Sequence, residues 1–119
     1  MVKKDRIKEA LKNNNFEILN KYNKNSMEMI FLSLFEEEMN DFNYDSDIDY
    51  LDNIIKLLPK YINNKKMVHE RLENIHQLIK TYLVQKPGNI EKTNHNYKLL
   101  KNIINNIELI QMSILYDYN

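Results

Sequence analysis

The chain has 119 residues, of which 43% are hydrophobic and 29% charged, and its formal net charge is zero. These values are typical of one globular domain, and they exclude both a disordered chain and a bulk attraction to nucleic acid or anionic lipid. One Gly and two Pro are too few for the turns that sheets need, and there is no Cys. We therefore expect an all-α, single-domain bundle of about five helices over residues 1–119, with the C-terminal helix at its centre.

The beginning of the chain alternates charged and apolar residues at helical spacing. Ile7 and Leu11 form an apolar stripe within residues 3–12, and the stripe resumes over residues 16–22 after three consecutive asparagines. This pattern predicts two short helices or one broken helix.

Residues 26–41 predict a helix that is apolar on more than one side. Ser26 is its expected N-cap, because its hydroxyl can accept a hydrogen bond from a first-turn N–H group. Most apolar residues of the stretch 27–35 share one face, but Met29 and Leu32 fall on the other. A helix that is apolar all round is normally buried or covered by a partner, and we expect burial here.

Charge is segregated along the chain. Residues 25–55 hold nine acidic residues and no Lys or Arg, whereas residues 1–24 and 56–119 have net charges of +4 and +5. Aromatic residues lie among these carboxylates, and such a surface suits a basic protein partner. The predicted partner-binding residues are Glu36, Glu37, Glu38, Asp41, Phe42, Tyr44, Asp45, Asp47, Asp49, Tyr50 and Asp52. The alternative is that these acidic residues form an ordinary solvated face.

The polar connection after this helix allows two interpretations. Residues 41–52 resemble an EF-hand calcium loop, because Asp or Asn occupies positions 1, 3, 5, 9 and 12. The match departs from that family at Ser46, where Gly makes the turn, and at Asp52, where a longer Glu is usual. In the second interpretation, Ser46 and Asp49 form a capping box for the next helix.

Three further helices follow. The first carries two apolar stripes between Ile48 and Ile62, and Pro59 is expected to kink or split it. The second runs from about Met67 to Gln85, before a Lys-Pro-Gly-Asn stop. The last continues to Tyr116, and its apolar stripe includes Gln111.

The sequence matches motifs of metal-binding and catalytic sites only weakly. His69, Glu73 and His76 lie near one side of a helix at metal-ligand spacing, and Glu73-x-x-His76 is similar to the motif of ferritin-like di-iron bundles. That site needs a second such motif, which the sequence lacks, so we expect no metal and no cofactor. No nucleophile has a His or carboxylate beside it in a local signature, and a single Gly cannot form a phosphate-binding loop. We expect a protein that is not an enzyme and does not bind nucleic acid directly.

A small, helical chain without catalytic motifs and with the acidic cluster 36–52 resembles the immunity proteins of bacterial toxin systems, including those of contact-dependent growth inhibition. The resemblance implies a cytoplasmic antitoxin that blocks a basic toxin, such as a nuclease. The absence of Cys, of a signal peptide and of a long apolar segment also favours a cytoplasmic protein without membrane contact.

The alternative function is a structural or regulatory helical module that self-associates through the apolar stretch 27–35. Its oligomeric state distinguishes the two hypotheses, and the inhibitor hypothesis favours a monomer.

Overall fold

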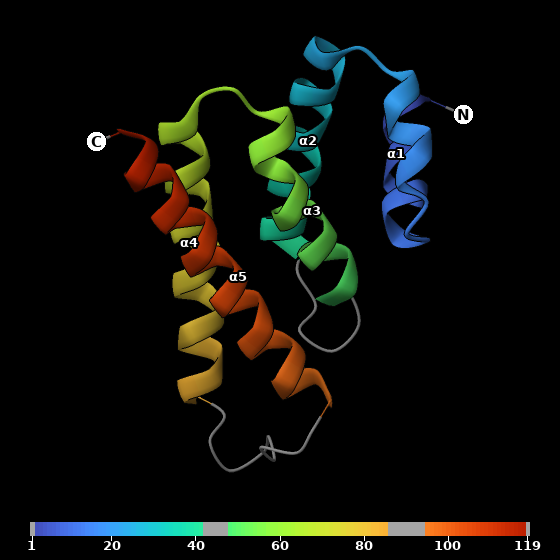
Figure 1. Cartoon of the computed structure of the whole chain (residues 1–119). Helices are drawn as coiled ribbons and strands as arrows, with labels where there is room; N and C mark the ends of the chain where they lie inside the picture. Colours follow the sequence, from blue (N-terminus) through green and yellow to red (C-terminus); the bar gives the residue numbers. More distant parts are fainter. Residues whose placement is uncertain (1, 42–47, 86–94, 119) are drawn as a thin grey trace. The chain divides into compact units, whose positions relative to one another are not determined.

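The computed structural model describes residues 2–41, 48–85 and 95–118. Every regular element in these residues is helical, which confirms the all-α prediction. In chain order they are α1 (Lys3–Lys12), the 3-10 helix η1 (Phe16–Lys21), α2 (Lys24–Asp41), α3 (Ile48–Tyr61), α4 (Lys65–Gln85) and α5 (His95–Tyr118) (Figure 1). None of these described helices combines the length and the apolar character needed to cross a bilayer.

The chain divides into two compact units, residues 1–63 and residues 64–119. Unit 1 holds α1, η1, α2 and α3, and unit 2 holds the helix pair α4 and α5. The predictions of one single domain and of a central C-terminal helix concern the relation between these units, and they stay predictions.

The core of unit 1 forms where α3 packs against both α1 and α2. Figure 1 shows α2 and α3 as antiparallel neighbours. Phe31 of α2 is fully buried, and its ring stacks on Tyr61 of α3 with 4.8 Å between the centroids. Four residues of the stretch 27–35 are buried, whereas Met29 is 74% exposed and the rest are half-buried, so the expected burial holds for one face of the helix. The buried four are Met27, Phe31, Leu34 and Phe35.

The break after α1 follows from its asparagines. Asn14 has a φ of 58°, a left-handed conformation that Asn tolerates better than most residues. This turn lets the Asn15 N–H donate to the Ala10 carbonyl at 2.9 Å and the Asn14 N–H donate to the Leu11 carbonyl at 3.4 Å. These two bonds form a Schellman motif, which satisfies carbonyls that the helix end leaves open. The chain then continues as η1, so the prediction of two short helices is confirmed.

The predicted cap of α2 is wrong. The helix begins at Lys24, and the side-chain Oδ1 of Asn23 accepts a hydrogen bond from the Ser26 N–H at 2.8 Å. Asn is as good an N-cap as Ser, so Asn23 caps the helix and places Ser26 in the first turn. Asn64 does the same for α4, where its Oδ1 accepts from the Met67 N–H at 3.1 Å.

Helix α3 runs through Pro59 without splitting. The proline lies in the last turn, where the loss of one backbone donor interrupts little of the helix. Beyond it, the Ile62 N–H still donates to the Leu58 carbonyl at 2.9 Å. The helix is therefore not split at Pro59, and the alternative expectation of a kink stays a prediction.

In unit 2, α5 packs along α4, and Figure 1 shows the two running in opposite directions. Both helices contribute a stripe of buried aliphatic residues, as their periodicity predicts. The buried residues are Val68, Leu72, Ile75 and Ile79 of α4 with Leu100, Ile103, Ile104, Ile107 and Ile114 of α5. His76 and Gln111 are buried with them.

Candidate functional site

The predicted acidic surface is only partly exposed. Glu36, Glu37 and Asp49 are exposed, and Asp52 is half-buried. Glu38 and Tyr50 are buried, with 7% and 4% of their surface exposed. The side chain of Asp41 and the residues Phe42, Tyr44, Asp45 and Asp47 lie outside the described part of the structure, together with the proposed calcium loop and the Ser46 cap.

Glu37 at the end of α2 forms an ion pair with Lys4 of α1. The hydrogen bond from Lys4 lowers the pKa of the Glu37 carboxyl, and the nearby charges of Lys4 and Lys8 act in the same direction. Part of the acidic charge is therefore balanced by the basic helix that precedes it in the chain.

Tyr50 was predicted to belong to the partner-binding surface, but it is buried and lies against α1. The Nζ atoms of Lys8 and Lys12 stand 6.0 and 5.3 Å from the centroid of its ring. Their positive charges face the negative face of the ring, a cation–π arrangement. Sequence spacing placed Tyr50 among carboxylates, whereas the packing of α3 on α1 turns its ring toward lysines.

Asn53 connects α3 to the end of α1, and a separate ion pair lies within α3 itself. The Asn53 side-chain Nδ2 donates to the Leu11 carbonyl and to Asn14 Oδ1, both at 2.8 Å, so it satisfies groups at the end of α1. One turn of helix separates Lys56 from Asp52, and their side chains form an ion pair at 2.8 Å.

The exposed carboxylates of the predicted surface lie at one end of the α2–α3 hairpin. Glu36 belongs to the last turns of α2 and Asp49 to the first turn of α3, and the antiparallel arrangement brings these helix ends together (Figure 1). Their neighbours Phe35 and Leu51 are buried, so the core anchors the helix ends that carry the charges. This acidic hairpin end is the first candidate site, with Glu36, Glu37 and Asp49 as its described members.

A second polar cluster lies between α4 and α5, and the sequence showed only its α4 side. Gln111 of α5 donates to the Glu73 carboxylate at 3.0 Å, and Gln77 donates to the same group at 2.9 Å. The hydrogen bonds from Gln77 and Gln111 lower the pKa of Glu73, with the positive fields of His76 and His69 assisting.

His76 has its own partner on α5. Its Nε2 lies 3.0 Å from the Glu108 carboxylate, while its buried Nδ1 has no hydrogen-bond partner among the described residues. Among the described residues no three His, Asp or Glu side chains gather as metal ligands. Glu73 instead contacts Gln111 of α5, and His76 contacts Glu108 of α5. The two side chains therefore connect α4 to α5. Spacing within one helix cannot reveal partners on another.

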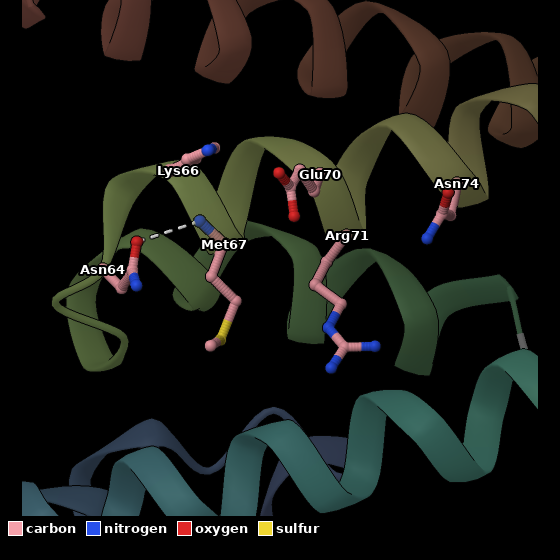
Figure 2. A pocket seen from close by; sticks show the side chains of 6 residues that line it. All are labelled: Asn64, Lys66, Met67, Glu70, Arg71 and Asn74. Carbon is pink, nitrogen blue, oxygen red and sulfur yellow. Dashed lines mark hydrogen bonds between the residues drawn. The ribbon is translucent and has the colours of Figure 1, made fainter.

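The described pockets are shallow and lined by single helices or helix pairs. Figure 2 shows one along the start of α4, where Met67 and Arg71 extend from one side of the helix and Lys66 and Glu70 from another. The dashed line in the figure is the bond that caps α4. This pocket carries charges of both signs and is open to solvent, so its residues form no arrangement for acid–base or nucleophilic chemistry.

Comparison with protein-family models, with curated proteins and with solved structures gives no match. The function of the chain can therefore be inferred only from its own sequence and structure.

Proposed function

We propose that this chain is a protein-binding inhibitor of the immunity-protein type, which uses its acidic hairpin end to block a basic toxin such as a nuclease. The observation that carries the proposal is the exposure of Glu36, Glu37 and Asp49 at one end of the α2–α3 hairpin. A cluster of carboxylates can occupy positions that a basic protein uses for phosphate, and it can accelerate association by long-range attraction.

The buried neighbours of these carboxylates support this role. Phe35 and Leu51 are at most 1% exposed, so the segments that present Glu36 and Asp49 are fixed by the core. A charged surface that is already ordered loses little entropy when it binds. The ion pair with Lys4 also restrains Glu37 in one orientation.

Charge reversal at the hairpin end tests the proposal. The tagged protein is used to capture binding partners from its host cells at low salt, and the bound proteins are identified by mass. Glu36→Lys with Asp49→Lys should slow association with a basic partner at least about tenfold, because the attraction becomes repulsion. The captured partner is then assayed for toxicity or nuclease activity with and without the inhibitor.

Glu17→Lys is the matched control, since it reverses an exposed carboxylate of unit 1 that lies on η1. Helical content by circular dichroism should match the native chain in all variants. Capture of the same basic partner at equal rates by the native chain and the double variant would contradict the proposal.

The alternative, self-association through the stretch 27–35, finds little support in the described surface. Phe31 and Leu34 are fully buried within unit 1, and Met29 is the large apolar residue of this stretch that is strongly exposed.

A further inference from the structure

A hollow of about 410 Å³ lies between α1 and η1 in unit 1. It is larger than the pocket of Figure 2, which holds about 330 Å³, and small-molecule sites in proteins hold roughly 300–1,000 Å³. Residues within 6–13 of α1 form one wall, and residues within 15–22 form the other. On each wall the lining residues are three or four positions apart, so each helix turns one side toward the hollow. We call this space the α1–η1 hollow.

The core of unit 1 fixes both walls. Ala10 of α1 and Leu19 of η1 are 4% and 1% exposed. The left-handed turn at Asn14 sends the chain back along α1, and the Lys3 Nζ lies 5.6 Å from the centroid of the Tyr22 ring. The end of η1 therefore lies beside the first turn of α1, and the α1–η1 hollow exists before any ligand binds.

The base of the α1–η1 hollow is apolar. Ala10 is buried there, and Ile18 and Tyr22 are half-buried. The small side chain of Ala10 leaves room between the helices. The flat Tyr22 ring suits a second aromatic ring, since such rings attract each other in offset or edge-to-face arrangements.

The rim of the α1–η1 hollow carries three charged side chains. Arg6, Glu9 and Lys21 are exposed, and none of them forms an ion pair with another described residue. Two positive charges and one negative charge give a net charge of +1. A carboxylate balances this charge, and Arg binds carboxylates through two parallel hydrogen bonds. A phosphate group carries almost two negative charges, so it would leave a net negative charge beside Glu9.

The placement of the charges gives the ligand a direction. Lys21 precedes Tyr22 and therefore lies toward the first turn of α1, as Arg6 does. The opposite end of the hollow lies at the C-terminus of α1, where the helix dipole disfavours anions. A carboxylate is therefore expected between Arg6 and Lys21, and an attached apolar body over Ala10 and Ile18.

We propose that the α1–η1 hollow binds a small organic carboxylate with a flat apolar body, which Arg6 and Lys21 hold by its charge. The α1–η1 hollow shares no residue with the acidic hairpin end. This inference therefore does not rest on the proposed function, and either can fail without the other.

Titration of the full chain with 3-phenylpropionate tests the proposal, with heteronuclear NMR as the readout and the ionic strength held constant. We expect saturable shifts in the signals of residues 6–22, with a dissociation constant of about 1 mM or lower. The neutral 3-phenylpropanamide and the ringless propionate should each bind at least about fivefold more weakly. Equal affinity of either analogue, shifts that do not saturate, or shifts spread over both units would overturn the proposal.

Charge variants identify the groups that hold the ligand. Arg6→Gln and Lys21→Gln should each raise the dissociation constant at least about fivefold, with unchanged helical content because both side chains are exposed. Glu9→Gln should lower it, because the variant removes a repelling carboxylate. Lys60→Gln is the matched control, since Lys60 is also an exposed lysine beside a tyrosine ring but does not line the hollow. An equal loss in Lys60→Gln, or weaker binding by Glu9→Gln, would contradict the assigned site.

Discussion

Unit 1 and unit 2 differ in how polar side chains connect their helices. In unit 1, apolar residues such as Phe31 fill the core, and Lys4 pairs with Glu37 at the surface. In unit 2, His76 and Gln111 are buried among the aliphatic residues of α4 and α5, where they contact Glu108 and Glu73. A polar contact between helices can therefore lie at the surface or within the core, and its position decides how much it contributes to stability.

The largest expected effect comes from the core of unit 1. Phe31→Ala removes a fully buried ring that stacks on Tyr61, and it should lower the free energy of unfolding by about 3–5 kcal/mol. Met29→Ala changes an exposed residue two positions earlier, and it should alter stability by less than about 0.5 kcal/mol. Urea unfolding measures both. Equal losses would show that α2 does not pack as described.

The buried amide of unit 2 should have the next largest effect. Gln111→Ala removes the buried donor to the Glu73 carboxylate and should cost about 1–3 kcal/mol. Gln77→Ala removes the exposed donor to the same carboxylate and should cost less, although it should raise the Glu73 pKa at least as much. Urea unfolding and a carboxyl titration by NMR separate the two quantities. A larger stability loss for Gln77→Ala would contradict the burial of this cluster.

Asn53 should contribute about 1 kcal/mol to unit 1, because its amide connects α3 to the end of α1. Asn53→Ala loses these bonds, and Asn53→Asp should cost more because a carboxylate oxygen would face the Leu11 carbonyl. Asn20→Ala, on the exposed side of η1, is the control and should be neutral. Thermal unfolding compares the three variants, and a neutral Asn53→Asp would contradict the contact between Asn53 and the Leu11 carbonyl.

The smallest effect is expected for the surface ion pair of unit 1. Glu37→Gln should change stability by less than about 1 kcal/mol, and salt should reduce the difference further. The pKa of Glu37 is lowered, so its contribution is present above the ordinary Glu pKa and disappears as the pH falls through the lower folded value. Unfolding of Glu37→Gln and the native chain across acidic pH checks this sign. A difference that grows toward low pH would contradict it.

Sequence patterns predicted the helices well because apolar periodicity determines which face of a helix is buried. The stripe through Leu100, Ile107 and Ile114 matches the buried face of α5, and Gln111 was correctly placed in it. The caps were less predictable. Asn23 and Ser26 are both good caps, and the choice between them depends on where the preceding turn ends.

The candidate site was harder to predict, since charge counts along a sequence do not show how charges pair in space. The middle segment has a net charge of −9, yet Lys4 of α1 contacts Glu37 and two other lysines of α1 lie against Tyr50. In the sequence of the last helix, Leu109 and Met112 lie across from the apolar stripe. Periodicity alone does not show whether such a second apolar face is covered, whereas the structure shows both residues exposed.

The most direct test of the central proposal, that this chain binds a basic protein through its acidic hairpin end, is the mass of the complex at two salt concentrations. Light scattering after size-exclusion chromatography would measure the native chain together with the basic partner that it captures. We predict a complex at low salt that loses the partner at high salt, because salt screens the attraction between exposed charges. A partner that stays bound equally well at high salt would contradict the proposal.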